Sequence, residues 1–475
     1  MIELGDVQPT LESLSGRLDA YAKYARYYDG DQSTAFASDI YRDTFGRLIR
    51  SLHYNRCSTV VDATADRLQI EAWQDEGAAP DAPSNKAAEE LWNVAGGDEL
   101  QGFVHVEAIK EGDAYVIVWP HPDDPQRPVW RMQSASTCEM IYDSETAEPI
   151  AGVKIWRETM GPDKGYWRLT IYEADAITRY ISTSTNQTRM PAKPGTFRAY
   201  GGDGGAVVPN PYGVLPIFAF RNNPQHQGSC GRSDLSDVIA LQDALNYTLW
   251  SLMIAEEFSA YPQKYATGVM PMDNDSGASG RFAGGIDRWI TVRAAEASFG
   301  VLQGGPLDPF IAACNDLDSK ISRVTRIPVH WLGLAGVSDN VSGETLKMLE
   351  GPFVAKLNDR AVSYGKAWGD AMGLALSIAG SVQENERRVM PIWKSFEAKS
   401  EADKLMSAMS KQTLGIPQRQ IWKELGYTDD QIVAMLAESE RVANEQAERN
   451  ARLFSQGGAT GFQEEDAQTS DEADA

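Results

Sequence analysis

Residues 233–258 read SDLSDVIALQDALNYTLWSLMIAEEF, a stretch with five acidic residues and neither lysine nor arginine. Its leucine, isoleucine and valine residues recur at helical spacing, so one face of a helix is expected to pack against other elements. The acidic residues are Asp234, Asp237, Asp243, Glu256 and Glu257. On the remaining surface of the helix these acids would repel a polyanion, and this repulsion favours a conduit over a binding groove. The alternative is that the charged face is simply the face in contact with solvent, as is common.

The bulk composition sets limits on the class of protein. The chain has 475 residues, enough for about three domains, and a formal net charge of -23. That charge argues against wrapping nucleic acid through lysine and arginine contacts with phosphates. Its four cysteines lie far apart without metal-ligand spacing, so neither a zinc site nor a disulfide framework is expected. No signal-peptide pattern or apolar run of about 18 residues occurs, so we expect a cytosolically made chain that does not span a membrane.

Periodicity predicts an α+β fold that is mainly helical. Helical stripes cover residues 10–28, 53–68 and 87–111, and short strand-like runs occur between 114 and 220. Helices at 233–258 and 308–326 then flank a segment rich in Gly, Pro, Ser and Asp. A long helix follows from Ser342 to about residue 379, and Gly351-Pro352 should kink it, because proline removes a hydrogen bond and clashes with the preceding turn. Three shorter helices and an acidic tail, expected to be disordered, complete the chain.

Sequence signatures of catalysis are missing. The pair Gly365-Lys366 is followed by Ala367, so it is no phosphate-binding loop, and the five histidines stand alone. Two clusters, Asp123-Asp124 and Asp273-Asn274-Asp275, could in principle hold Mg²⁺ for a nuclease. Both lie in turn-rich segments where aspartate commonly supports turns, which favours solvated turn residues. We therefore expect neither an enzyme nor a bound cofactor.

Several motifs follow one another in the order of a known family. They are Tyr27-Tyr28-Asp29-Gly30, NRCSTVVDATADRL (55–68), GDAYVIV (112–118), PYGVLPIFAFRNN (211–223), GRSDLSDVIALQDALN (231–246) and SGETLK (342–347). Together they resemble the portal proteins of tailed bacteriophages, specifically the gp6-like group of siphophages. The resemblance covers nearly the whole chain up to the acidic tail.

The resemblance implies a ring, typically a homododecamer, at one capsid vertex of the virion. Double-stranded DNA would be packaged and ejected through it, and the ring would be assembled in the cytoplasm of the bacterial host. The implied partners are the terminase large subunit, which would supply ATP hydrolysis, a head-tail connector or adaptor, and the major capsid and scaffolding proteins. No membrane is involved.

The resemblance also implies a division of the chain. In order, residues 1–230 would form an α+β wing, 231–258 a stem helix, 259–306 the clip, 307–327 a second stem helix, 328–345 the tunnel loop, 346–399 the long kinked helix and a return to the wing, 400–460 a helical crown, and 461–475 the disordered acidic tail.

Candidate functional residues follow from this division. The acids Asp234, Asp237, Asp243, Glu256 and Glu257 would line the channel on the stem, and Gly351 with Pro352 would be a hinge. Lys347, Lys356 and Arg360 would contact DNA phosphates or form ion pairs with neighbouring carboxylates. The tunnel-loop residues would be Gly336, Val337, Ser338, Asp339 and Asn340.

Two other readings stay open. The chain could be a minor capsid or head-tail connector protein that joins shells without conducting DNA. A metal-dependent nuclease acting on phage DNA is the less favoured one.

Overall fold

The computed structural model describes residues 2–32, 54–77, 79, 82–201, 206–260, 264–267, 296, 298–301, 304–332, 343–380, 389–397, 401–425, 427 and 429–457. The chain forms two compact units, an N-terminal unit, Met1–Glu397, and a C-terminal unit, Ala398–Ala475. The predicted tunnel-loop tip, the Asp273-Asn274-Asp275 cluster and the acidic tail lie outside the described residues.

The N-terminal unit opens with helices on which the predicted apolar stripes are confirmed. They are α1 (Gln8–Tyr28), α3 (Arg56–Ala65), α4 (Pro83–Val94) and α5 (Gly97–Glu111). The side chain of Asn55 caps α3 by accepting hydrogen bonds from the backbone N–H groups of Cys57 and Ser58. The helical pattern at 87–111 belongs to two helices, because Gly96 adopts a left-handed φ of 65° between them.

Antiparallel strands form the sheets of the N-terminal unit, which we call the body apart from its projecting helices Ile239–Ala260 and Asp308–Thr325, so the predicted α+β fold is confirmed. Strand β2 pairs with β10 and β3, a larger sheet has the order β4-β5-β6-β7-β8 with β9 also on β7, and β1 pairs with β13. The strands are β1 (Ile70–Asp75), β2 (Asp113–His121), β3 (Asp124–Ser134), β4 (Cys138–Tyr142), β5 (Pro149–Arg157), β6 (Trp167–Tyr172), β7 (Ala176–Ser182), β8 (Phe197–Ala199), β9 (Val207–Pro209), β10 (Ile217–Arg221) and β13 (Val389–Trp393), and the 3-10 turn η1 (Pro194–Thr196) precedes β8.

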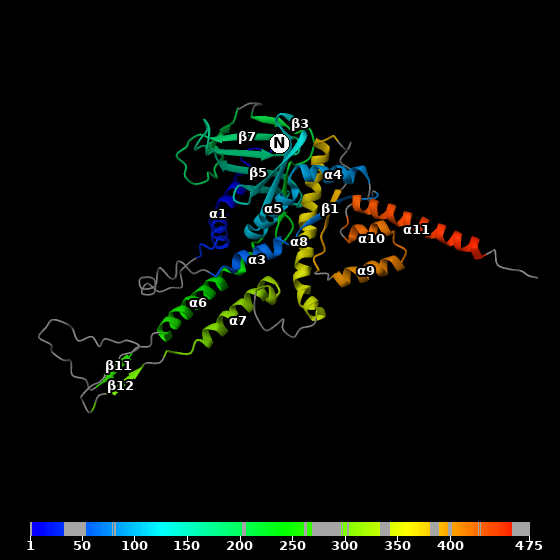
Figure 1. Ribbon diagram of the computed structural model, residues 1–475. Helices are drawn as coiled ribbons and strands as arrows, with labels where there is room; N and C mark the ends of the chain where they lie inside the picture. Colours follow the sequence, from blue (N-terminus) through cyan, green and yellow to red (C-terminus); the bar gives the residue numbers. More distant parts are fainter. Residues whose placement is uncertain are drawn as a thin grey trace, which may run out of the picture. The chain divides into compact units, whose positions relative to one another are not determined.

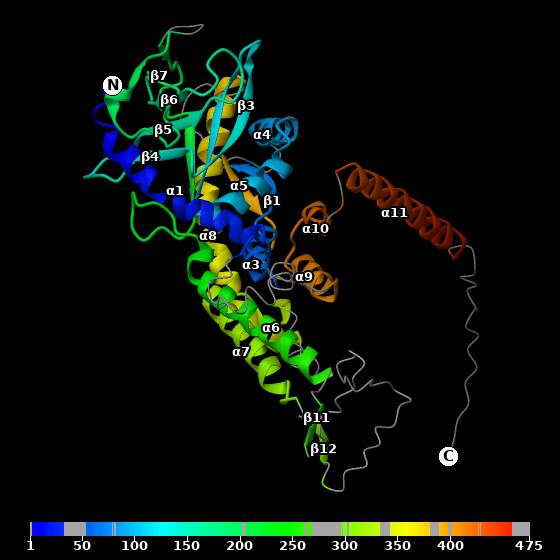
Figure 2. The same ribbon diagram turned by 90° about the vertical axis from the view of Figure 1, so that its left-hand side faces the viewer.

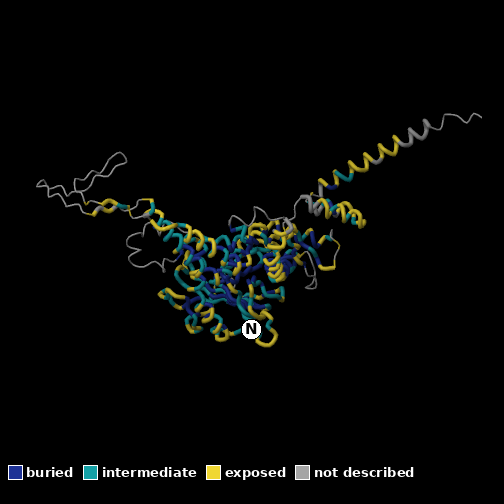
Figure 3. Tube along the Cα trace, turned by 90° about the horizontal axis from the view of Figure 1, so that it is seen from below, coloured by how far each residue is buried: buried dark blue, intermediate teal, exposed yellow. Residues whose placement is uncertain are grey.

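A helical hairpin projects from this body (Figures 1 and 2). It consists of α6 (Ile239–Ala260) and α7 (Asp308–Thr325), which pack side by side, and of the strands β11 (Lys264–Thr267) and β12 (Ser298–Val301), which pair at its far end. The predicted helix at 233–258 starts with a separate 3-10 turn, η2 (Asp234–Asp237), where the Ser233 hydroxyl accepts the backbone N–H of Leu235. Buried residues concentrate in the body, whereas the hairpin is largely intermediate or exposed (Figure 3).

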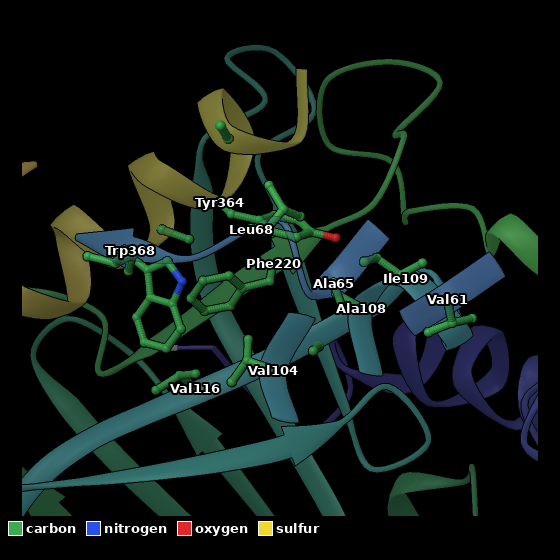
Figure 4. Packing of buried hydrophobic residues seen from close by; sticks show 14 of the residues in the cluster. Val61, Ala65, Leu68, Val104, Ala108, Ile109, Val116, Phe220, Tyr364 and Trp368 are labelled. Atoms are coloured by element: carbon green, nitrogen blue, oxygen red, sulfur yellow. The ribbon is translucent and has the colours of Figure 1, made fainter. Parts of the chain in front are cut away.

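The long helix α8 (Gly343–Ile378) runs through the centre of the body, after the 3-10 turn η3 (Val329–Leu332). It continues through Pro352 as one helix, and its buried face includes Tyr364 and Trp368. The Trp368 ring lies 4.6 Å, centroid to centroid, from that of Phe220 on β10, and Figure 4 shows this packing. Helix α8 therefore joins the central sheet to the rest of the core.

The C-terminal unit is helical, as predicted. Its helices are α9 (Glu401–Thr413), α10 (Gln418–Glu424) and α11 (Asp429–Gly457). Within it Ile421 on α10 and Ile432 on α11 are buried, while several larger apolar side chains of α9 stay exposed.

Candidate functional site

The five predicted channel-lining acids lie on the hairpin or at its base. The prediction that Asp234 lines the channel is wrong, because its side chain is only 11% exposed. The Lys356 ammonium lies 2.6 Å from its Oδ2 atom, and the Arg360 guanidinium lies 3.5 Å from Oδ1. The side-chain amide of Asn222 donates a further hydrogen bond of 2.8 Å. Asp234 therefore anchors η2 inside the protein and offers no charge to a channel.

Asp243 is the second channel-lining acid that the structure contradicts. It is 9% exposed, and the Tyr27 hydroxyl lies within hydrogen-bonding distance of its carboxylate. Two neighbours on α6, Gln242 and Asn246, are fully buried. The Gln242 side chain accepts the backbone N–H of Arg56 at 2.8 Å, and that of Asn246 accepts the backbone N–H of Tyr54 at 3.2 Å. The face of α6 that meets the body is polar as well as apolar.

The remaining three acids are exposed on this chain. Asp237 forms an ion pair with Arg232 and is half-exposed. Glu256 and Glu257 are exposed at the end of α6 that leads to β11. Their place on the projecting hairpin is compatible with a channel surface, and their role as channel lining remains a prediction.

The predicted phosphate contacts of Lys356 and Arg360 are wrong. These residues are 5% and 8% exposed, and both pair with Asp234, so of the two predicted roles ion pairing is confirmed. Lys347 is exposed on the first turns of α8, so its contact with DNA stays a prediction. Gly351 and Pro352 are exposed within α8, and their action as a hinge likewise stays a prediction.

Sequence reasoning missed a second buried ion pair at the hairpin base. The guanidinium of Arg56 donates to both carboxylate oxygens of Asp318 on α7, at 2.8 and 2.9 Å, and to the carbonyl of Leu332 at 2.6 Å. The sequence could have indicated that Asp318 is buried, because its position in the helix places it on the packed stripe of α7 beside Leu317 and Ile321. A carboxylate at such a position needs a buried partner.

Electrostatics distinguish the two buried carboxylates on the α6 side. Burial by itself would raise the pKa of Asp234, but the positive charges of Lys356 and Arg360 outweigh it, and its pKa is lowered. Among the described residues no cation forms an ion pair with Asp243. Burial raises the pKa of Asp243, although the Tyr27 hydrogen bond and the charge of Lys23 oppose the shift. Asp234 is thus held as a carboxylate by its ion pairs.

The described part of the chain shows no cluster of three or more His, Cys, Asp or Glu residues able to hold a metal ion. None of its helices is both long enough and apolar enough to cross a membrane. The acidic residues described above instead form ion pairs, accept hydrogen bonds or face outward.

The chain thus combines an α+β body with a projecting helical hairpin whose base is held by buried ion pairs. The chain belongs to the phage portal protein family of the SPP1 Gp6-like type, whose family model matches residues 12–451. The family resemblance predicted from the sequence motifs is therefore confirmed.

Individual relatives agree with this assignment. The chain is 23% identical over 392 residues to the portal protein of Mycobacterium phage D29, covering 78% of this chain and 75% of that protein. It is 22% identical over 431 residues to the portal protein of Mycobacterium phage L5, covering 86% and 82%. Among solved structures, it resembles a chain from the neck of an empty gene transfer agent particle, with a TM-score of 0.44 and 11% identity over 75% of this chain and 84% of that one.

Proposed function

We propose that copies of this portal protein close into a ring, a homododecamer, through which double-stranded DNA is packaged and later ejected. The observation that carries the proposal is the projecting α6/α7 hairpin, on a chain that belongs to the portal family. Its helix α7 exposes Ile311 and Val324, apolar side chains that a neighbouring copy would cover. Head-to-tail contacts between identical subunits close into a ring when the rotation divides the circle.

The acidic surface of the hairpin suits a channel for moving DNA. Each lysine or arginine that neutralises a phosphate adds salt-dependent attraction, and many such contacts would hold the duplex in place. Asp237, Glu256 and Glu257 would instead repel the phosphates and keep the bound state shallow. With Asp234 and Asp243 buried, these three are the α6-side acids that we assign to the channel.

The remaining parts are assigned by the same proposal. Residues 1–230 form the wing, 231–258 and 307–327 the stem, 259–306 the clip and 400–460 the crown. The loop at 328–345 rings the DNA with Gly336, Val337, Ser338, Asp339 and Asn340 at its tip. The segment 346–399, with α8 hinged at Gly351 and Pro352, carries loop movements to the wing.

The ring would stand at one capsid vertex of the virion after assembly in the host cytoplasm. It would contact the terminase large subunit, the head-tail connector, and the major capsid and scaffolding proteins. The terminase would hydrolyse ATP, while this chain acts without catalysis as the conduit.

Negative-stain electron microscopy of the purified full-length protein tests the proposal. We expect rings with a central hole. Monomers or sheets would contradict it and favour a connector that joins shells without conducting DNA. The nuclease alternative is tested on the same sample, because Mg²⁺-dependent cleavage of plasmid DNA would show an activity that a conduit lacks.

A further inference from the structure

The base of the hairpin meets the body through buried apolar residues, including Leu235, Leu245 and Ile321, and also through a set of charged and polar contacts. We call these contacts the joint. They are Asp234 with Lys356 and Arg360, Asp318 with Arg56, Asp243 with Tyr27, and the amides Gln242 and Asn246 with residues 54–56. All the carboxylates lie on η2, α6 or α7, and all the cations lie on α3 or α8. The joint is therefore complementary in charge.

Lys356 is the centre of this joint. Its ammonium contacts Asp234 of η2 at 2.6 Å, the hydroxyl of Thr64 of α3 at 3.3 Å and the backbone carbonyl of Thr325 of α7 at 3.2 Å. An ammonium has three N–H donors, and here three acceptors from three elements surround it. Because Thr325 ends α7, the positive charge also meets the negative end of that helix dipole. One side chain of α8 thus contacts both η2, the turn that leads into α6, and the last residue of α7.

Stability alone is a poor reason for this arrangement. Removing a lysine and an aspartate from water carries a large desolvation cost, and apolar residues of similar volume often replace a buried ion pair without loss of stability. A buried charge that contacts partners on several elements has a different effect, because few arrangements of those elements provide all of its partners at once. An apolar contact at the same place would tolerate sliding and rotation of the two helices.

We infer that Lys356 is a positioning residue that sets the direction of the α6/α7 hairpin relative to α8, and this inference rests on the proposed channel function. Subunits in a closed ring must all present the same rotation to their neighbours. A hairpin whose direction varied between copies would leave the contacts between neighbouring stems out of register. The joint provides each copy with the same direction before it meets its neighbour.

Lys356→Met tests the inference, because it removes the charge and keeps most of the apolar stem. Lys366→Met is the matched control, since it makes the same change at an exposed position of the same helix. We expect both variants to fold, as judged by circular dichroism. In Lys356→Met, amide hydrogen exchange should rise about tenfold or more in α6 and α7 while α5 and β2 remain as in the wild type. Complete rings should become rarer in electron micrographs, and the control should match the wild type.

Asp234→Asn is the second variant, for use if Lys356→Met does not fold. It keeps the shape of the side chain and removes its charge. We therefore expect amide exchange in α6 and α7 to rise again, but by less than in Lys356→Met. Wild-type exchange in the hairpin of the folded variants would overturn the inference. Failure of both variants to fold would also overturn it, because the cluster would then be needed for the whole fold. If instead the wild type forms no rings, the proposed function fails, whereas hairpin exchange still decides the role of Lys356.

Discussion

The hydroxyl oxygen of Tyr27 lies 2.7 and 2.9 Å from the two carboxylate oxygens of Asp243. This contact links the last turn of α1 to the first turns of α6, across 216 residues of sequence. It explains how a helix with an acidic sequence can turn one of its acids inward. The hydroxyl supplies a donor to a carboxylate that forms no ion pair with any cation in the described parts of the chain.

Tyr27→Phe should therefore destabilise the protein by about 1.5 to 3 kcal/mol, the range for a lost hydrogen bond to a charged group. The ring stays in place, so the effect reports the hydroxyl and the carboxylate left without it. Chemical denaturation of the two proteins measures the difference. Tyr247→Phe, at a 40% exposed position on α6, should change the unfolding free energy by less than about 0.5 kcal/mol. Equal stability of Tyr27→Phe and the wild type would refute the prediction.

Gly231→Ala should be among the most destabilising single substitutions in the body. A Cβ atom at this position would lie 1.9 Å from the carbonyl oxygen of Gly112 and 2.8 Å from backbone atoms of Asn222. Backbone must move to admit it, so we expect a loss of about 3 kcal/mol or more, at the upper end for overpacking.

Gly102→Ala is the contrasting change. Gly102 is exposed in the middle of α5, and nothing lies within 4 Å of an added Cβ. Alanine has the higher helix propensity, so this variant should be more stable by up to about 1 kcal/mol. Thermal unfolding of both variants checks the pair, and similar melting temperatures would contradict the steric argument.

Much of the fold could be predicted from local patterns. The helical stripe at 53–68 includes Val60 and Val61, and both are buried on α3. The strand-like run that begins at residue 114 is confirmed as β2. Spacing works there because these residues meet apolar neighbours on every side. The prediction that such a residue is buried therefore does not depend on knowing which residues it contacts.

The same method was wrong about Asp234 and Asp243 because their burial depends on distant partners. Lys356 and Tyr27 lie more than a hundred residues away along the chain, so no local pattern pairs them with these acids. The position of Asp243 on the helix could still have indicated that it is buried. It shares a face with Ile239 and Trp250, both buried, so a solvated position was never available to it.

Asp113 should give the body a pH dependence of its own. It is 1% exposed, and burial raises its pKa from 3.8 to about 6, although the backbone N–H of Gly231 and the charge of Arg17 oppose the shift. Between these two values the folded protein keeps a proton that the unfolded chain has released. The contribution of Asp113 to the free energy of unfolding therefore falls as the pH rises from about 4 to about 6, by up to about 3 kcal/mol.

Denaturation of wild type and Asp113→Asn across this pH range measures that contribution. Asparagine cannot titrate, so the stability of the variant relative to wild type should increase with pH and level off above about pH 6. Groups that do not interact with Asp113 titrate in both proteins and cancel in the difference. Glu139, whose charge contributes to the raised pKa of Asp113, is the neighbour whose titration the substitution also changes. Asp19→Asn, which makes the same substitution at an exposed position of α1, serves as the control. A flat difference for Asp113→Asn would show that its carboxyl is not perturbed.

The exposed glutamates at the end of α6 provide the most direct test of the channel. Reversing their charge with Glu256→Lys and Glu257→Lys should slow DNA passage while rings still assemble, because neither side chain is buried. Each new lysine could neutralise a phosphate, and for B-DNA the slope of log affinity against log salt changes by about 0.9 per phosphate neutralised. DNA binding by purified rings should therefore become tighter and more salt-dependent, and the amount of DNA packaged per unit time should fall.

Glu89→Lys with Glu90→Lys is the matched control, since these adjacent glutamates are exposed on α4 of the body. It makes the same change in net charge away from the hairpin, so any general effect of charge on DNA binding appears in both double variants. If the channel surface includes the end of α6, only the hairpin variant should hinder packaging. Equal packaging by the two variants, with intact rings in both, would remove Glu256 and Glu257 from the DNA path and assign their charges to the outer surface of the stem.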